Sequence, residues 1–248
     1  MKDQLEHVKS TYNHHNAVRK YVLDIDDIGL WESERILFKK YVTEDSSIID
    51  IGCGAGRTTF GLYKIGYTNI TGVDLSENLI ENAIEIAKER EISIKFETGN
   101  ALELKYKDSS FDSALFSFNG IMHIPLMSNR VKTMTEIKRI IKTGSKFIFT
   151  THEDRDRVEE FKDFWKNYKK TWEEGKQDKR LLEYGDSIFT KDNLEYYIHF
   201  ATKDEIIHTI TEAGLSLTET MLRSEICDEN KRIKEYSVDC RFWITEKK

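Results

Sequence analysis

The sequence predicts an α/β protein built around a mainly parallel sheet. Short runs of β-branched residues that stop at a glycine or an acid alternate with segments of helical period along most of the chain. The first run, Ser47 to Ile51, ends at Gly52, as a strand buried on both faces does. Alternation of this kind favours right-handed crossovers that place helices on both faces of one sheet.

A helical arm is expected before the first strand. Residues 1–43 mix charges with apolar positions whose spacing is closer to the helical period than to the strand period. These positions are Ile28, Trp31, Ile36, Leu37 and Tyr41. We therefore expect an N-terminal helical arm over 1–43 and one domain over 44–248.

The alternation continues as far as residue 151. We expect helices over 57–65 and 77–90 and around Met134 up to Gly144, and strands over 69–74, 93–97, 113–118 and 146–151. Ser76 stands where it can cap the helix over 77–90, because a serine hydroxyl accepts a hydrogen bond from a free amide at a helix start.

An insertion at about 153–200 interrupts this pattern with charges of both signs. Apolar residues recur in it at the spacing of one helix face: Val158, Phe161, Trp165, Tyr168 and Trp172. That face packs the insertion onto the body of the protein or, alternatively, forms an aromatic wall of a substrate pocket. Two strand-like runs, 188–190 and 194–200, then flank Lys191-Asp192-Asn193 and predict a hairpin.

The C-terminal part returns to the sheet. Thr202 to Glu205 has the form of a capping box, and Gly214 stands where the helix between them must end. Two strand-like runs follow, 215–221 and 238–245, and we expect no helix between them. They should pair antiparallel at one edge of the sheet.

Charge and composition exclude several classes of function. The 248 residues carry 38 basic and 44 acidic side chains, and the net charge of −6 offers no broad positive field to nucleic acid. No apolar run approaches the length of a membrane span, and the first ten residues lack a signal-peptide core. Three cysteines without a CxxC pair favour a cytoplasmic protein without disulfides, and no spacing of histidines and carboxylates predicts a metal site.

The most informative stretch runs from Asp50 to Arg57, Asp-Ile-Gly-Cys-Gly-Ala-Gly-Arg, between a predicted strand and a predicted helix. Glycines there allow a tight turn and a close approach of backbone to a ligand, and the helix start offers free amides. Arg57 occupies the position of the third glycine of a dinucleotide-binding loop. Asp50 would repel a pyrophosphate and attract an ammonium or sulfonium group, so the loop suits a cationic amino-acid nucleoside better.

Two later strand ends carry polar residues that suit a nucleoside. Asp74 ends the strand over 69–74, at the edge where ligands of open α/β sheets bind, and its carboxylate can accept both hydroxyls of a ribose. Alternatively, Asp74 serves the helix start beside Ser76, and the two roles are compatible. Asn100, after the next strand, can both donate to and accept from an adenine edge, or it forms an ordinary turn.

Four stretches together resemble the class I S-adenosylmethionine-dependent methyltransferases, in particular the small-molecule methyltransferases of type 11 or 25. They are Asp50 to Gly56, Gly72 to Ser76, Gly99 to Ala101 and Ser110 to Asp112. The resemblance implies a Rossmann-like sheet of seven strands in the order 3-2-1-4-5-7-6, with strand 7 antiparallel. It also implies S-adenosyl-L-methionine as the cofactor.

The resemblance further implies which residues hold the cofactor. Contacts are expected to the methionine part from Asp50, Gly52, Cys53, Gly54 and Gly56, to the ribose from Asp74, to the adenine from Leu75, Asn100 and Ala101, and to the sulfonium from Ser117 and Phe118.

Methyl transfer is an in-line displacement that gains mostly from alignment and desolvation, so it requires no diagnostic catalytic residue. A hydroxyl or a protonated amine as acceptor would use a base, and His123 is the candidate because the loop after the fourth strand faces the reactive end. The alternative for His123 is a packed or helix-capping histidine. We expect Tyr12, Trp31 and His152 to line the acceptor pocket together with His123. Tyr12 belongs to the N-terminal arm, which in similar enzymes folds over the cofactor as a lid. The alternative for this arm is a helix on the protein surface.

A small molecule is the expected acceptor. A DNA-methylating enzyme of similar fold would carry an Asn-Pro-Pro-aromatic run where this chain has Ser117 to Gly120, and protein-arginine enzymes need paired glutamates. We therefore expect methyl transfer to an oxygen or nitrogen atom of an unidentified small molecule. Two other functions stay open: a module that binds S-adenosylmethionine or S-adenosylhomocysteine without turnover, and an NAD-dependent oxidoreductase.

Overall fold

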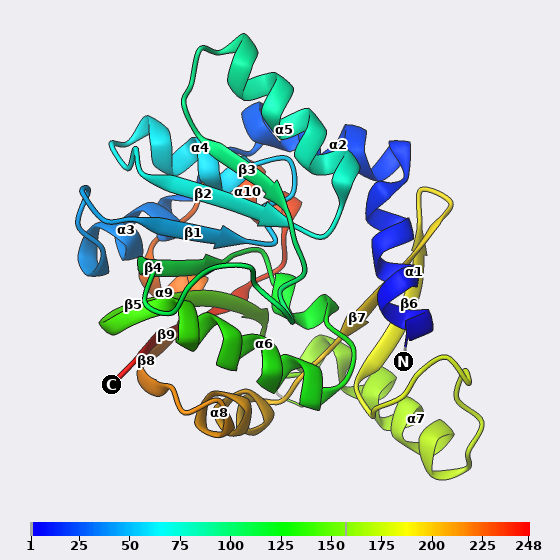
Figure 1. Cartoon of the computed structure of the whole chain (residues 1–248). Helices are drawn as coiled ribbons and strands as arrows, with labels where there is room; N and C mark the ends of the chain where they lie inside the picture. Colours follow the sequence, from blue (N-terminus) through cyan, green and yellow to red (C-terminus); the bar gives the residue numbers. More distant parts are fainter. Residues whose placement is uncertain (1, 157) are drawn as a thin grey trace.

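The structure is a computed structural model that describes residues 2–156 and 158–248. Its centre is a seven-stranded sheet (Figure 1) formed by β1 (Ile48–Ile51), β2 (Ile70–Asp74), β3 (Lys95–Thr98), β4 (Phe111–Phe116), β5 (Ile141–His152), β8 (Ser216–Leu222) and β9 (Cys240–Glu246). The strands lie in the order β3-β2-β1-β4-β5-β9-β8. β9 runs antiparallel to both of its neighbours, and the other neighbouring pairs are parallel. Because β8 and β9 are the sixth and seventh strands of this sheet along the chain, the predicted order 3-2-1-4-5-7-6 is confirmed.

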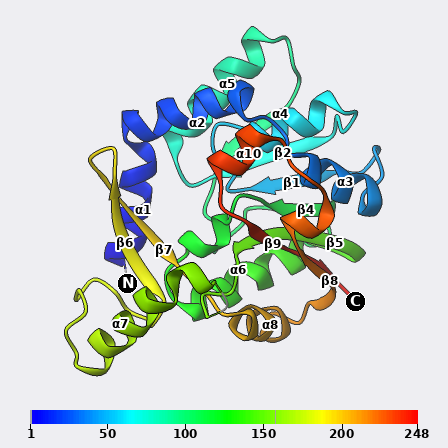
Figure 2. The same ribbon diagram turned by 180° about the vertical axis from the view of Figure 1, so that it is seen from behind.

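Helices cover both faces of this sheet (Figures 1 and 2). They are α3 (Glu32–Tyr41), α4 (Arg57–Lys64), α5 (Glu77–Glu89), α6 (Met127–Ile140) and α8 (Lys203–Glu212). Ile48 of β1 belongs to one buried cluster with Leu37 of α3 and Leu62 of α4. The next residue, Ile49, belongs to another cluster with Ile137 of α6. Successive side chains of a strand point to opposite faces, so β1 is buried on both, as its β-branched run predicts.

The N-terminal segment is helical, and it consists of α1 (Lys2–Asn13), α2 (His15–Asp27) and α3. α2 packs against α4 and α5, and α1 packs against α5 and against β7 (Leu194–His199). At the end of α1, the side-chain oxygen of Asn13 accepts a hydrogen bond from the Ser76 hydroxyl at 2.7 Å. α1 therefore ends directly over the start of α5, next to the carboxyl end of β2.

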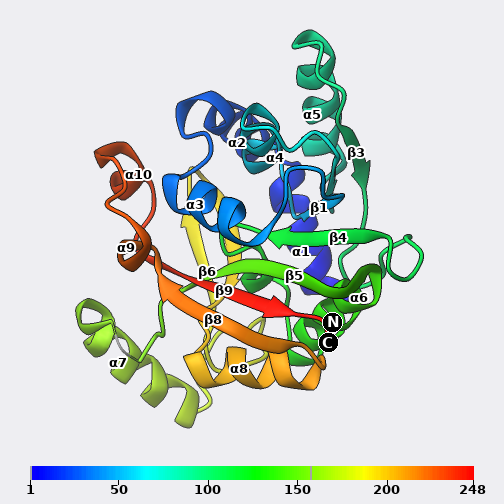
Figure 3. The same cartoon turned by 90° about the vertical axis from the view of Figure 1, so that its left-hand side faces the viewer.

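The insertion between β5 and α8 lies at the periphery (Figure 3). It contains a short 3₁₀ turn, η2 (Glu159–Phe161), then α7 (Lys162–Glu173) and a hairpin of β6 (Asp186–Lys191) and β7. The two hairpin strands pair antiparallel, which confirms the predicted hairpin. In α7, Trp165 is buried and its ring lies 5.5 Å from that of Phe200, whereas Phe164 is exposed. The aromatic stripe thus packs mainly within the insertion.

Two details of the predicted fold are wrong. Two short helices, α9 (Arg223–Ile226) and α10 (Lys231–Tyr236), lie between β8 and β9, where we expected none. Helices of 4 and 6 residues are too short to show a helical period in the sequence. In addition, α6 ends at Ile140 and not near Gly144, because β5 begins at the next residue and Gly144 lies inside that strand with φ +83°.

A buried carboxylate, that of Asp186, holds the hairpin together. Its Oδ1 accepts hydrogen bonds from the Tyr197 hydroxyl at 2.7 Å and from His199 Nδ1 at 2.8 Å, and its Oδ2 accepts from two backbone amides. Burial acts to raise the pKa of Asp186, but these hydrogen bonds outweigh it and hold the pKa below its usual value. Glu183 lies close enough to complete a metal site with Asp186 and His199, yet Arg130 already donates to Glu183 at 2.8 Å.

Replacing this carboxylate should destabilise the fold. Asp186→Asn should lower the free energy of unfolding by about 3 kcal/mol at pH 7, because it removes charge-assisted hydrogen bonds from a buried site. A folded-state pKa below the ordinary value of 3.8 stabilises the fold above that pH, and this contribution is lost as the pH falls through the folded-state pKa. Urea unfolding at pH 7 and at pH 3 should therefore show a smaller difference between variant and wild type at pH 3.

The matched control for this experiment is Asp178→Asn, which removes an exposed carboxylate paired with Arg180. It should change the free energy of unfolding little, because surface ion pairs contribute little. Equal losses in Asp178→Asn and Asp186→Asn would contradict the special role of the buried carboxylate.

Candidate cofactor and acceptor site

The chain between β1 and α4 turns through glycines in the left-handed region. Gly52 and Gly56 have φ of +64° and +95°, and Gly56 is the N-cap of α4. A Cβ atom at Gly52 would stand 2.4 Å from the ring of Phe116, so a side chain does not fit there. The bare backbone therefore passes along the carboxyl edge of the sheet, beside the free amides at the start of α4.

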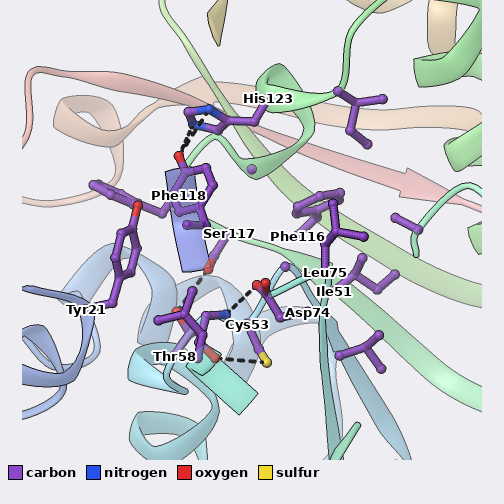
Figure 4. Close-up of a pocket in the computed structure, with 18 of the residues that line it drawn as sticks. Tyr21, Ile51, Cys53, Thr58, Asp74, Leu75, Phe116, Ser117, Phe118 and His123 are labelled. Carbon is purple, nitrogen blue, oxygen red and sulfur yellow. Dashed lines mark hydrogen bonds between the residues drawn. The ribbon is translucent and has the colours of Figure 1, made fainter. Parts of the chain in front are cut away.

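A cavity of about 990 Å³, including the space at its mouth, opens at this edge (Figure 4). Its walls come from the loops after β1, β2, β3 and β4 and from α1, α2 and α10. Of the residues expected to contact the cofactor, those that line it are Gly52, Cys53, Gly54, Asp74, Leu75, Asn100, Ala101, Ser117 and Phe118. The cavity lies where β1 and β4 meet and the strand order reverses, which is the usual ligand position in open α/β sheets.

Asp74 holds both the glycine loop and the start of α5. Its two carboxylate oxygens accept hydrogen bonds from the amides of Gly54 and Ser76, each at 2.8 Å. Burial raises the pKa of Asp74 above its usual value, and these backbone donors oppose the rise. Asp74 therefore serves the helix start and also lies in the cavity wall, so the two interpretations of this residue are compatible.

Asn100 forms a local turn at the far side of the cavity. Its Oδ1 accepts a hydrogen bond from the amide of Leu102 at 3.0 Å, as an ordinary turn asparagine does. Its Nδ2 has no partner among the residues that the structure describes, and the side chain lies in the cavity wall. The amide group is thus available to a ligand while the oxygen shapes the turn.

Asp50 lies beneath the glycine loop and not in the cavity wall, although we expected its charge to face a ligand. It is fully buried, and its Oδ2 accepts a hydrogen bond from the Thr59 hydroxyl at 2.6 Å. Its Oδ1 has no partner in the described part of the chain. Burial raises the pKa of Asp50 to about 7, against the opposing effects of Thr59 and of the Arg57 charge. The carboxyl group therefore titrates near neutral pH, and its second oxygen keeps the capacity to accept a hydrogen bond.

Arg57 connects the glycine loop to the N-terminal helices. Its two terminal nitrogens donate to the carboxylate of Glu34 at 2.8 and 2.7 Å, and Nη1 also donates to the carbonyl oxygen of Gly29 at 2.6 Å. Both charged groups are buried. The sequence motif did not reveal the ion pair between Arg57 and Glu34. A signal was present, because a positive charge in the first turn of a helix is unfavourable next to the helix dipole and so indicates that an acidic partner lies nearby.

Two of the four residues expected at the acceptor do not reach the cavity. Trp31 is fully buried, with the guanidinium groups of Arg57 and Arg223 over its ring at 5.1 and 5.0 Å. Its size and its position at the start of α3 make it part of the core. His152 lies 3.4 Å from the Asn119 side-chain nitrogen, and burial lowers its pKa to about 4. Neither side chain lines the cavity.

The other two, Tyr12 and His123, lie together in the cavity wall. The Tyr12 hydroxyl lies 3.2 Å from Nδ1 and 3.3 Å from Nε2 of His123, and Nδ1 lies 2.8 Å from the carbonyl oxygen of Tyr197. Burial lowers the pKa of His123 to about 4, so its ring is neutral at pH 7. Burial also raises the pKa of Tyr12 well above its ordinary value, so that its hydroxyl keeps its proton.

Three further lining residues had no signal in the sequence motifs. Tyr21 and Asp24 come from α2, and Tyr236 comes from α10. The Tyr236 hydroxyl donates to Asp24 at 2.6 Å, and its ring stacks on Phe118 with centroids 5.3 Å apart. These residues meet only through tertiary packing, and the helix that carries Tyr236 was not predicted.

Comparison with known proteins identifies the family. A family model described as a methyltransferase domain, Methyltransf_31, matches residues 43–234. The chain belongs to the class I S-adenosylmethionine-dependent methyltransferases. S-adenosyl-L-methionine is therefore the cofactor of this methyltransferase. The left-handed glycine loop and the unpaired Asp50 oxygen beneath it fit a cationic cofactor.

Several known proteins that are similar to this chain are named as methyltransferases. The methyltransferase is 32% identical over 158 residues to a probable methyltransferase, ltbC, of Aspergillus luteorubrus, which covers 60% of this chain and 53% of that one, about half its length. It is 26% identical over 215 residues to a demethylmenaquinone methyltransferase of Staphylococcus aureus, which covers 80% of this chain and 81% of that one. A solved structure of a SAM-dependent methyltransferase from Methanosarcina mazei has a TM-score of 0.69 at 20% identity, covering 88% of this chain and 98% of that one.

Removing the counter-ion of Arg57 should unfold the methyltransferase more easily. Glu34→Gln should lower the free energy of unfolding by about 3–5 kcal/mol, because a buried guanidinium is left without a negative partner. The matched control in the same helix is Glu32→Gln, which removes an exposed carboxylate paired with Arg35 and should have a small effect. Urea unfolding measures the free energy of unfolding of both variants. If Glu34→Gln is as stable as the wild type, the ion pair between Arg57 and Glu34 does not fix the N-terminal helices to the glycine loop.

Proposed function

We propose that the methyltransferase transfers the methyl group of S-adenosylmethionine to an oxygen or nitrogen atom of a small molecule. The observation that supports this proposal is one continuous cavity with two different ends. In Figure 4, Cys53 of the glycine loop and Asp74 lie on one side of the cavity and His123 lies on the other, with the Tyr12 hydroxyl beside His123. A donor and an acceptor bound in such a cavity would lie next to each other.

Each end of the cofactor has suitable residues in the proposed binding mode. The backbone of Gly52 to Gly56 follows the methionine part, with Asp50 beneath it. Asp74 accepts the ribose hydroxyls, and Leu75 lies against the adenine. The remaining contacts come from Cys53 and Gly54 in the loop, from Asn100 and Ala101 at the edge of the base, and from Ser117 and Phe118 beside the sulfonium.

The bound cofactor supplies an electrophilic methyl group, and the chain supplies alignment and exclusion of water. Holding two reactants in line is worth roughly 7–11 kcal/mol of the barrier. Tyr12 of α1 and Tyr21 of α2 lie in the cavity wall, so the arm over 1–43 acts as a lid in this proposal. In the proposed domain organisation, the rest of the chain is the methyltransferase domain over 44–248, which includes the insertion at about 153–200.

His123 is the proposed base for an acceptor that must lose a proton. Its ring is neutral at pH 7, it lines the cavity, and only one of its nitrogens is needed for the carbonyl of Tyr197. A small molecule is the proposed acceptor, and residues from α1, α2 and α10 line the cavity around the place proposed for it. Among the helices that the structure describes, none has both the length and the apolar character needed to cross a membrane.

Calorimetry with S-adenosylmethionine and S-adenosylhomocysteine tests the cofactor site. Asp74→Asn should weaken both ligands about 10- to 100-fold, because it removes a charged acceptor of the ribose hydroxyls. Asp108→Asn, at an exposed carboxylate that does not line the cavity, is the control and should bind as the wild type does. Wild-type affinity in Asp74→Asn would contradict the ribose role.

The affinity for S-adenosylmethionine should also depend on pH through Asp50. A positively charged ligand favours the ionised carboxylate, and the pKa of Asp50 is raised to about 7 by burial. Below this pH the carboxyl group must release a proton before it can stabilise the ligand, so the affinity should fall by up to about tenfold between pH 8 and pH 6. Asp50→Asn should bind more weakly at pH 8 and show a shallower dependence on pH.

The amino group of the ligand titrates equally in both experiments, so the comparison isolates the protein group. Calorimetry in two buffers of different ionisation enthalpy should show proton release on binding to the wild type at pH 6.5 and less release with Asp50→Asn. Identical slopes for the two proteins would refute an electrostatic role of Asp50.

A further inference from the structure

The acceptor end of the cavity is mostly aromatic. Around Tyr12 and His123, the cavity wall also includes Leu5, Tyr21, Ile124 and Tyr236. The ring of Tyr12 meets those of Tyr21 and His123 edge-on, with centroids 5.7 and 5.5 Å apart. Tyr236 adds a stacked pair with Phe118. Such rings favour a flat, largely apolar ligand.

The charged groups around this end already have partners. Arg57 is the one cation in the lining among the described residues, and both of its terminal nitrogens donate to Glu34. Asp24, in the same wall, accepts hydrogen bonds from Lys20 at 2.7 Å and from Tyr236 at 2.6 Å. A carboxylate or phosphate placed here would lose its hydration without gaining a counter-ion, and that is unfavourable by several kcal/mol. The lining therefore selects an uncharged acceptor.

Tyr12 and His123 form a directed hydrogen-bond chain. A carbonyl oxygen can only accept, so His123 Nδ1, 2.8 Å from the carbonyl of Tyr197, carries the ring hydrogen. Nε2 is then the accepting nitrogen, and the Tyr12 hydroxyl donates to it across 3.3 Å. Tyr12 keeps an oxygen lone pair for a donor in the cavity that it lines.

We propose that the acceptor is an uncharged planar molecule with a phenolic or enolic hydroxyl, and that Tyr12 and His123 form a proton relay for that hydroxyl. This inference rests on the proposed methyl transfer and specifies its acceptor. The acceptor hydroxyl donates to the Tyr12 oxygen. As the acceptor oxygen bonds to the methyl carbon, the carbon–sulfur bond breaks and its electron pair stays on sulfur. The acceptor proton passes to Tyr12, and the Tyr12 proton passes to Nε2 of His123, which becomes an imidazolium.

This relay keeps the net charge of the cavity constant. One positive charge disappears at sulfur while one appears on His123, so no new charge is created where water is excluded. Before the transfer, burial keeps the pKa of His123 at about 4 and that of Tyr12 well above its ordinary value. The ring is therefore neutral and the phenol is protonated, which is the state that the relay requires at its start.

Binding of matched probes tests the acceptor class. Calorimetry first measures S-adenosylhomocysteine, and no binding would overturn the methyl transfer itself. On protein loaded with S-adenosylhomocysteine, 4-phenylphenol should bind at least about tenfold more tightly than 4-phenylbenzoate, which has the same rings and a carboxylate. Equal or tighter binding of the benzoate, or no binding of either probe, would overturn the acceptor class while leaving the cofactor site intact.

Turnover tests the relay. With S-adenosylmethionine and 4-phenylphenol, Tyr12→Phe keeps the ring, removes the hydroxyl and should lower kcat about 100-fold or more, with an unchanged Kd for S-adenosylmethionine. His123→Gln should lower kcat by a similar factor. The double variant should be no slower than the slower single variant, because the two groups act in series.

The matched control is Tyr196→Phe. The Tyr196 ring packs on Tyr12 with centroids 6.0 Å apart, but no hydrogen bond joins Tyr196 to His123 in the described structure. Its kcat should stay within about twofold of the wild type. A wild-type kcat in Tyr12→Phe, or losses of kcat that multiply in the double variant, would overturn the relay. If the protein binds the cofactor but does not methylate 4-phenylphenol, the proposed acceptor class is overturned.

Discussion

The close approach of bare backbone to the end of the central strand is the constraint on which this site depends. Gly52 leaves no room for a Cβ atom, and Gly56 opens α4 from the left-handed region. Because the loop carries no bulky side chain at these points, the cavity stays open and the first amides of α4 stay free. Asp74 accepts from the amide of Gly54 and so takes its position from the turn, whereas Asp50 is held within β1 and by the hydroxyl of Thr59 in α4.

The same turn also fixes the N-terminal helices. Arg57 stands at the positive end of α4, where a cation alone is unfavourable, and Glu34 of α3 neutralises it. The carbonyl of Gly29 accepts from the same guanidinium, so the elbow between α2 and α3 is tied to the loop. Tyr21 of α2 then lies over Gly54. A buried ion pair of this kind adds less to stability than to the choice of one geometry, and here that geometry brings the arm over the cavity.

Local patterns in the sequence predict most of the strands and helices and the glycine turn, and the family resemblance predicts the strand order. The glycine turn, the acid within β1 and the acid that ends β2 belong to short stretches whose structure depends on neighbouring residues, and the roles given to them toward the cofactor stay predictions. The acceptor end is different, since Tyr21 and Tyr236 are 215 positions apart along the chain and reach it from two separate helices, and α10 is too short to show a period. Trp31 and His152 show the same limit, because the sequence indicates the element to which a residue belongs but not the direction of its side chain.

The hairpin has a consequence for any redesign of this protein. It lies outside the sheet, in the part of such a fold where loops are most readily exchanged, yet the carbonyl of Tyr197 determines which nitrogen of His123 bears hydrogen. Grafting another hairpin to admit a larger compound would thus change the tautomer of the imidazole as well as the room available. An exchange that keeps the backbone position of residue 197 avoids this, whatever side chain stands there.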